Sequence, residues 1–295
     1  MKTLPLLLAL ALPLSAQNLL PENPHQFGRS HAEIKNGELQ INLTPGKWSA
    51  VSKRLPLKKG YYQLSFEHNA PAGARMAFSL TPQNRKEYGR QFRDPFPDGS
   101  PRRMDGFLYQ PEDGPVQINI FAEGKSPVTI TVHNIRLTAF HPDATFKLEP
   151  DPRSTPFWGP QWTYRNTNYK FEYTDAEDHI DGGKALRFHP EDGKKATVQT
   201  SAFPVLPGKE YQISLWLKAS AELPANFLID GWINGGKKHW YLMKKIRLGT
   251  GWQEYSMRFT APEEAVYRGM MTLKVELNAP VQWLDIKTAE LKELK

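Results

Sequence analysis

Three side chains in the stretch "LPGKEYQISLWLKA" have the chemistry to hold a flat, hydroxylated ring: Trp216, Gln212 and Ser214. A sugar ring presents an apolar face of C–H groups and a rim of hydroxyls, so it suits an aromatic plane beside short polar groups. The positions between them are apolar: Tyr211, Ile213, Leu215 and Leu217. A half-buried strand would therefore place the three together on its exposed face, with Trp216 as a candidate platform. The alternative is that a neighbouring loop or the other domain covers this face.

A second group of aromatic residues lies in "DGWINGGKKHWYLMKK", where we expect a glycine-rich exposed loop or hairpin. It contributes Trp232, Trp240 and Tyr241. Aromatic side chains near an exposed tip have little apolar surface to join, which favours a binding role for them. We therefore expect Trp216, Trp232 and Trp240 to line one groove.

Residues that could catalyse a reaction do not form a recognisable set. Glycoside hydrolysis needs two carboxylates about 5 to 9.5 Å apart on rigid elements. Glu172, Glu254 and Glu276 each stand alone on an expected strand, and no spacing pairs them. The sequence has no metal-binding histidine cluster and no G-x-S-x-G nucleophile turn. A binding protein without catalytic activity is the favoured interpretation, and a hydrolase with an unrecognised carboxylate pair is the alternative.

The chain carries a formal net charge of +7, and the excess lies in its first half. The segment "NRKEYGRQFRDPFPDGSPRR" contains Arg85, Lys86, Arg90 and Arg93 with aromatic residues between them. Such a patch could bind an anionic polysaccharide or an envelope surface, and export of the chain argues against nucleic acid. The alternative is a solvated loop with scattered charge.

Residues 1–17 are typical of a secretory signal peptide. Lys2 precedes an apolar run from Leu4 to Leu14, and small residues follow it. The run is too short to span a bilayer, and no later segment is long and apolar enough. The chain has no cysteine, so its domains would be held by their cores and not by disulfides. We expect a secreted protein, either periplasmic or extracellular.

Short alternating runs broken by Gly, Pro, Asn and Asp predict an all-β fold with two β-sandwich domains. The first is expected at 18–141 and the second at 161–295, with a proline-rich linker at 142–160. The two halves repeat one order of elements, in which Glu67 takes the place of Trp216. The first domain would therefore bind differently, through its basic segment, or act as a spacer.

Five stretches of the chain form a recognisable series: "NLLPENPHQF", "GKALRF", "LPGKEYQISLWLKA", "GWQEYSMRFTAP" and "VQWLDIKTAEL". In these stretches the chain resembles carbohydrate-binding modules of families 4 and 9, which are jelly-roll sandwiches of the galactose-binding-like group. The resemblance implies two tandem jelly rolls and a polysaccharide or glycan ligand. It also implies either a stand-alone sugar-binding protein or one whose partner, a glycoside hydrolase, is a separate chain. It also implies a structural Ca²⁺ near Asp285. The alternative is that Asp285 pairs with backbone or with a lysine, and no other cofactor is required.

The leading hypothesis is therefore a secreted, non-catalytic carbohydrate-binding protein. Its expected ligand-binding residues are Trp216, Gln212, Ser214, Trp232, Trp240 and Tyr241. The main alternative is an extracellular structural or adhesion protein whose aromatic face docks a protein or the sister domain. Glycan binding requires these aromatic residues to be exposed, whereas docking requires them to be buried.

Overall fold

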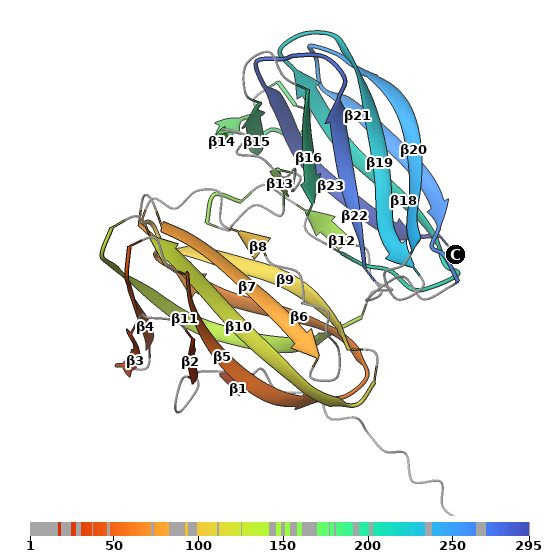
Figure 1. Ribbon diagram of the computed structural model, residues 1–295. Coiled ribbons are helices and arrows are strands. Elements are labelled where there is room, and N and C mark those ends of the chain that lie inside the picture. The colour runs from red at the N-terminus through yellow and green to blue at the C-terminus, as the bar shows by residue number, and fades with distance from the viewer. Residues whose placement is uncertain are drawn as a thin grey trace, which may run out of the picture.

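The chain forms two β-sandwiches, which Figure 1 shows in a computed structural model. None of the described segments is a helix with the length and hydropathy of a membrane span. The structure describes residues 17–18, 25–27, 31–36, 38–45, 48–71, 74–82, 92–93, 99–110, 112–124, 126–141, 146–148, 151–153, 158–160, 170–176, 178–179, 181–190, 195–200, 203–233, 238–263 and 270–294.

In the first sandwich the described strands form two antiparallel sheets. Sheet A has the order β3-β4-β11-β6-β9, and β1 also pairs with β11. Sheet B has the order β2-β5-β10-β7-β8. The strands are β1 (Gln17–Asn18), β2 (His25–Phe27), β3 (His31–Lys35), β4 (Glu38–Leu43), β5 (Trp48–Leu57), β6 (Gly60–His68), β7 (Ala74–Pro82), β8 (Phe92–Arg93), β9 (Arg102–Gln110), β10 (Gly114–Gly124) and β11 (Val128–Phe140).

The second sandwich is built in the same way. Sheet C has the order β14-β15-β23-β18-β21, with β12 also on β23, and sheet D has the order β13-β16-β22-β19-β20, with β17 also on β22. The strands are β12 (Phe146–Leu148), β13 (Trp158–Pro160), β14 (Lys170–Asp175), β15 (Lys184–His189), β16 (Ala196–Thr200), β17 (Phe203–Pro204), β18 (Glu210–Ala219), β19 (Leu223–Ile233), β20 (Lys238–Leu248), β21 (Gln253–Thr260), β22 (Met270–Leu277) and β23 (Leu284–Glu293). The expected all-β fold is confirmed.

The five-strand paths of the two sandwiches correspond one to one, and β17 on β22 has no counterpart among the described strands of sheet B. β12 pairs with β23 as β1 pairs with β11, and β13 pairs with β16 as β2 pairs with β5. The segment expected to be a linker, 142–160, therefore holds two strands of the second sandwich, whose first strand begins at Phe146. Both strands are three residues long and lie among prolines. They are too short to show the apolar–polar alternation from which a strand is predicted.

Alternation along the strands builds the two cores, as the sequence predicts. The inward rows are buried: Leu39, Ile41 and Leu43; Tyr62, Leu64 and Phe66; Val116, Ile118 and Ile120; Leu186 and Phe188; Tyr211, Ile213, Leu215 and Leu217; Leu273, Val275 and Leu277. Each large apolar side chain buried in this way contributes about 1.5 to 3 kcal/mol. The residues between them lie on the outer faces of the sheets and are free to serve other roles.

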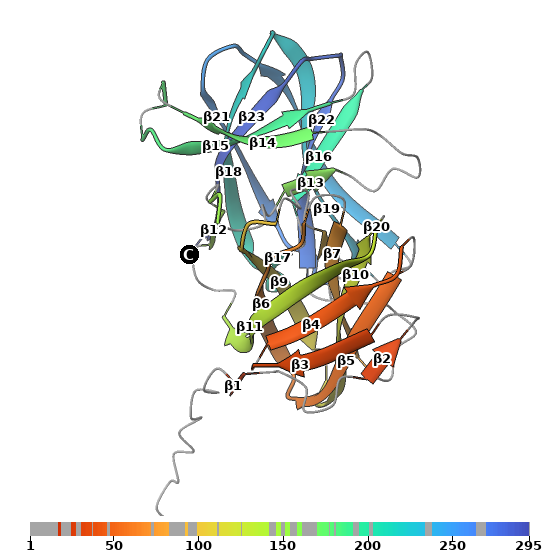
Figure 2. The same ribbon diagram turned by 90° about the vertical axis from the view of Figure 1, so that its left-hand side faces the viewer.

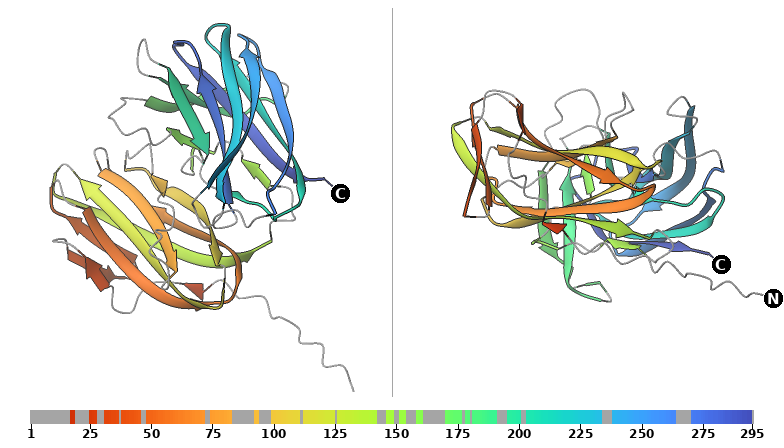
Figure 3. Two further views of the ribbon diagram at one scale, coloured as in Figure 1. Left: turned by 45° about the vertical axis from the view of Figure 1, so that its right-hand side comes forward. Right: turned by 90° about the horizontal axis from the view of Figure 1, so that it is seen from below.

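The two sandwiches touch at Tyr61, which belongs to an aromatic cluster at one end of the outer face of sheet A. The Tyr61 hydroxyl donates to the Val205 carbonyl, 2.9 Å away, and β17 lies beside β9 (Figure 2). The Tyr61 and Tyr109 rings are tilted against each other with 4.7 Å between their centroids, and the Phe107 and Phe140 rings with 4.8 Å. Burial, with the neighbouring tyrosines, raises the pKa of Tyr61. The strands of the two sandwiches run in clearly different directions (Figure 3).

Candidate functional site

Strand β18 places Trp216, Gln212 and Ser214 on the outer face of sheet C, as expected from the alternation. Its burial pattern alternates without a break, and Trp216 is half-buried. Gln212 accepts a hydrogen bond from Nε of Arg258, 3.4 Å away. Ser214 lies opposite Ser256 and Glu290 in the sheet register.

Trp216 is covered by a turn that connects β14 to β15. The buried His179 ring stands edge-on to Trp216 at 4.7 Å and to Trp252 at 5.3 Å. The neighbouring Asp178 accepts hydrogen bonds from Nε1 of Trp252, 3.0 Å away, and from Lys218, which lower its pKa. The alternative considered from the sequence, that a neighbouring loop covers the face with Trp216, is therefore what the structure has.

Backbone hydrogen bonds fix this covering turn. His179 N donates to the Ala176 carbonyl, and Gly182 N donates to the His179 carbonyl, both at 2.9 Å. Gly182 and Gly183 have φ of 56° and 79°, a conformation that glycine adopts without strain. The turn that seats His179 against the tryptophans is therefore encoded by this glycine pair.

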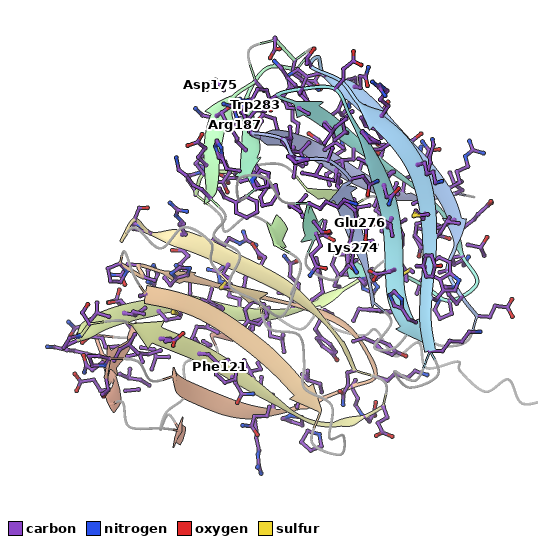
Figure 4. All side chains as sticks on the ribbon, turned by 45° about the horizontal axis from the view of Figure 1, so that its top comes forward. Phe121, Asp175, Arg187, Lys274, Glu276 and Trp283 are labelled. Carbon is purple, nitrogen blue, oxygen red and sulfur yellow. The ribbon has the colours of Figure 1, made fainter. Side chains whose placement is uncertain are left out.

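Asp285 forms a bidentate ion pair and is 3% exposed. Arg187 donates from Nε to Oδ1 at 2.6 Å and from Nη2 to Oδ2 at 2.7 Å, and its guanidinium lies 4.2 Å from the Trp283 ring (Figure 4). The described residues contain no group of three or more metal-binding side chains. A guanidinium on both oxygens puts a positive charge where a cation would bind, so these residues do not fit a calcium ion at Asp285.

The hairpin of β19 and β20 carries the second aromatic group and belongs to the other sheet, D. Trp232 pairs with His239 in the register, and Tyr241 pairs with Asp230. Trp240 packs against the core, with its ring 6.3 Å from Phe259. The structure therefore does not bring Trp216, Trp232 and Trp240 to one groove, because β18 and the hairpin lie in different sheets.

Around Tyr241 the outer face of sheet D contains a buried acid that sequence reasoning missed. Asp230 is 6% exposed and accepts hydrogen bonds from Thr272 and Lys274, and its Oδ2 lies 2.7 Å from Nε2 of His239. Burial acts to raise the pKa of Asp230. The hydrogen bond and positive charge of Lys274, together with the hydrogen bonds of Thr272 and His239, outweigh this effect and hold the pKa below its usual value. The carboxylate is ionised and ties β19, β20 and β22 together.

Further polar side chains extend this face across the sheet. Lys274 lies opposite Gln199 on β16 and Leu228 on β19. Glu276 accepts a hydrogen bond from Nδ2 of Asn226, 3.1 Å away. Figure 4 labels Lys274 and Glu276 on this sheet.

The aromatic and apolar groups of the same face are unusually accessible. Tyr241 is 60% exposed and Met243 is 42% exposed. The Tyr241 ring stacks on the His239 ring, with 5.8 Å between centroids and an interplanar angle of 25°.

We call the face formed by Asp230, His239, Tyr241, Met243, Lys274, Gln199, Asn226 and Glu276 the hairpin face. It combines an exposed aromatic plane with fixed hydrogen-bonding groups, which is what a ring with one apolar side requires.

Other residues singled out in the sequence stand apart from the hairpin face. Arg85, Lys86 and Arg90 lie outside the described residues, and the Arg93 backbone pairs with Ala77 in sheet B. Glu67, in the place of Trp216, lies with Oε2 2.9 Å from Nε2 of His133.

The glutamates considered for catalysis are also apart from one another. Glu172, on β14, is bound by Lys170 and His189. Glu254 lies opposite Trp216 on β21, and Glu276 is in the other sheet. Three strands of sheet C lie between β14 and β21, so the structure does not bring Glu172 and Glu254 together as the close carboxylate pair that hydrolysis needs.

Residues 159–280 match the family model for modules of families 4 and 9, described as "Carbohydrate binding domain". The resemblance read from the sequence is therefore confirmed for the second sandwich. No curated protein matches the chain.

Solved structures of low identity are also similar to the chain. The CBM22-1-CBM22-2 tandem domain of Xyn10C from Paenibacillus barcinonensis is 13% identical, with a TM-score of 0.40, over 96% of this chain and 98% of its own. The CBM22-1 xylan-binding domain of the same enzyme is 14% identical, with a TM-score of 0.41, over 52% of this chain and 94% of its own. At these identities and scores the structures add no argument about ligand or activity.

Proposed function

We propose that the protein is a secreted, non-catalytic glycan-binding protein whose second sandwich binds its ligand on the hairpin face. The observation that carries the proposal is the exposed Tyr241 ring beside the buried Asp230 cluster, within the segment that matches the carbohydrate-binding family. The aromatic plane would stack on the C–H face of a sugar ring. His239 and Lys274, held in place by Asp230, would bond to its hydroxyls.

The proposal differs from the sequence-based one in its choice of face. Trp216 is half-buried against His179, and its neighbours on sheet C are engaged in ion pairs such as Arg187–Asp285. Stacking a sugar on Trp216 would require the turn that carries His179 to move. The hairpin face needs no such movement, because Tyr241 is already exposed.

Four further parts of the proposal start from the sequence. Secretion, to the periplasm or the exterior, is inferred from the signal-like residues 1–17. The absence of catalysis is supported by the separation of Glu172, Glu254 and Glu276. A glycoside hydrolase on a separate chain remains a proposed partner, and the basic segment with Arg85 remains a proposed site for anionic glycans.

A docking role is favoured by one specific observation, and it concerns the first sandwich. Tyr61, Tyr109, Phe107 and Phe140 lie on the outer face of sheet A, where Tyr61 bonds to Val205 of the second sandwich. We propose that this aromatic cluster holds the sister domain, so that the chain presents its ligand-binding faces at a fixed angle.

Affinity electrophoresis tests the proposed function. The full chain is run in gels that contain hydroxyethyl cellulose, soluble xylan, laminarin or polygalacturonate, beside the variant Tyr241→Ala. We expect at least one gel to retard the native chain, and the variant to lose retardation by about tenfold in affinity, equal to 1.4 kcal/mol. Equal mobility of the native chain in all gels and in blank gels would refute the proposal.

A further inference from the structure

Strand β20 carries the largest positive charge of the described strands. It contains Lys238, Lys244, Lys245 and Arg247 and has no Asp or Glu. Together the described strands of sheet D hold five Lys and Arg against two Asp and Glu, whereas those of sheet C hold eight against seven. The positive charge of the second sandwich is therefore concentrated on the sheet that forms the hairpin face.

The alternation of β20 places Lys245 on the same side of the sheet as Tyr241. Trp240 and Ile246 pack against the second core, and β20 pairs with β19 without a register shift. Tyr241, Met243 and Lys245 alternate with them and therefore lie on the outer face, where all three are exposed. At about 3.3 Å per residue, this row spans about 13 Å along the strand.

The charge of Lys245 is available to a ligand. Among the residues that the structure describes, none forms an ion pair or a hydrogen bond with its ammonium group. Its Cα partner is the neutral Asn226, whose Nδ2 donates to Glu276 in the next strand. Lys274, the other lysine of the hairpin face, is already bound by Asp230. Figure 4 labels Lys274 and Glu276, the two charged residues that β22 adds to this face.

Two neighbouring cations of β20 differ from Lys245 in this respect. Arg247 donates from Nε and Nη2 to Oε2 of Glu222, at 3.2 and 3.1 Å. Lys244 lies on the opposite side of the alternation, and its Nζ donates to the Ser256 carbonyl of sheet C, 2.9 Å away. Lys244 is therefore a matched control for Lys245, with the same charge on the same strand but another direction.

We propose that the hairpin face prefers an acidic glycan, in which one sugar stacks on Tyr241 and an anionic group farther along the chain pairs with Lys245. The row from Tyr241 to Lys245 is longer than one sugar ring, so the ligand is a chain of sugars lying along β20, with Met243 beneath it. The anionic group is a carboxylate or a sulfate ester, since an ammonium group acts as a point charge toward either. The cations of β20 would attract such a chain from solution.

This inference rests on the proposed function and can fail while that function stands. Isothermal titration of the full chain compares hexagalacturonate with its methyl ester, which keeps the backbone and loses the charge. A sulfated galactan hexasaccharide and its unsulfated form separate sulfate from carboxylate as the recognised group. Cellohexaose and xylohexaose are the neutral comparisons. The variants are Lys245→Gln, Tyr241→Ala and the control Lys244→Gln.

We expect the native chain to bind one of the two acidic sugars at least about fivefold more tightly than its uncharged form. The preference should disappear between about 0.01 M and about 1 M ionic strength, where the Debye length falls from about 30 to about 3 Å. Lys245→Gln should lower affinity for the acidic form about three- to fivefold and leave the uncharged form unchanged. Lys244→Gln should change neither by more than about twofold, and Tyr241→Ala should weaken both about tenfold.

Other results would count against one claim or the other. Equal affinity for charged and uncharged forms, or binding of neutral sugars alone, with loss on Tyr241→Ala, overturns the acidic preference while the proposed function stands. A preference that Lys245→Gln leaves intact also overturns it. If the triple variant Arg85→Ser, Lys86→Ser, Arg90→Ser then removes that preference, the basic segment of the first sandwich recognises the charge. Absence of binding to all six sugars contradicts the proposed function itself.

Discussion

Tyr241 and Asp230 are Cα partners across the β19–β20 hairpin, yet one side chain is 60% exposed and the other residue is 6% exposed. The contrast arises because β20 is the edge strand of sheet D, whereas β19 is paired on both sides. Asp230 consequently lies between two strands that supply donors, His239 on one side and Thr272 and Lys274 on the other. An exposed ring is thereby set beside a rigid polar cluster.

Substitution of Asp230 by asparagine should destabilise the second sandwich. Lys274 would then keep its charge without its partner carboxylate, and loss of one partner of a buried ion pair costs about 3 kcal/mol. The measurement is urea unfolding of Asp230→Asn against Glu276→Gln, a matched carboxylate on the same face whose bond to Asn226 is partly exposed and should contribute about 1 kcal/mol. Equal losses in the two variants would show that Asp230 is not the centre of the cluster.

The stabilisation by Asp230 should also depend on pH in one direction. Because the pKa of Asp230 is lowered in the folded chain, its contribution is fully present above the unfolded pKa of about 4 and is lost as pH falls through the lower folded value. The difference in unfolding free energy between the native chain and Asp230→Asn should therefore be constant from pH 5 to 7 and shrink below about pH 4. A difference that grows on acidification contradicts this assignment.

Removal of calcium should leave the second sandwich unchanged. Arg187 occupies both oxygens of Asp285, so EDTA should not shift the melting temperature, and added Ca²⁺ should not raise it. Asp285→Asn should cost about 3 kcal/mol, because it leaves the Arg187 guanidinium without its partner. A rise in melting temperature with Ca²⁺ that Asp285→Asn abolishes would restore the calcium site that the family resemblance implied.

The start of the second sandwich can be tested with two fragments. Fragment 144–295 keeps β12, whereas fragment 154–295 loses the strand and its three register pairs with β23. We expect the shorter fragment to be less stable by about 1 to 2 kcal/mol, a shift of several degrees in melting temperature. Lys147→Ala in the longer fragment serves as control, since the Lys147–Glu290 ion pair is 3.6 Å long and largely exposed. Equal melting temperatures for the two fragments would mean that β12 adds nothing to the domain.

The sequence was sufficient for the parts of the fold that local alternation determines. Tyr211 to Leu217 read directly as an inward row, and the burial pattern of β18 matches it residue by residue. The strands β12 and β13 could not be read in this way. Three residues among prolines carry no period, and their pairing depends on partners more than 30 positions away in the chain.

The candidate site was harder to predict because it depends on register between distant strands. Asp230 and Lys274 are 44 positions apart, and nothing in their local sequences indicates that they meet. A partial signal existed in the hairpin: once Ile233 pairs with Lys238, Asp230 must lie opposite Tyr241 and diagonal to His239. The prediction of Trp216 as an exposed platform failed for a related reason. The turn whose His179 packs against Trp216 lies 37 positions earlier in the sequence, so the local alternation did not indicate it.

The most direct test of the proposed binding face compares Tyr241→Ala with Trp216→Ala in fragment 144–295, which holds the second sandwich alone. The measurement is retardation in the polysaccharide gel that holds the native fragment, together with the melting temperature. We predict that Tyr241→Ala lowers affinity at least about tenfold, or 1.4 kcal/mol, with the melting temperature unchanged within about 2 °C. Trp216→Ala should instead destabilise the fold by about 2 kcal/mol or more and leave retardation of the folded fraction intact. Loss of binding on Trp216→Ala at unchanged stability, with Tyr241→Ala still retarded, would place the ligand on sheet C and contradict the hairpin face.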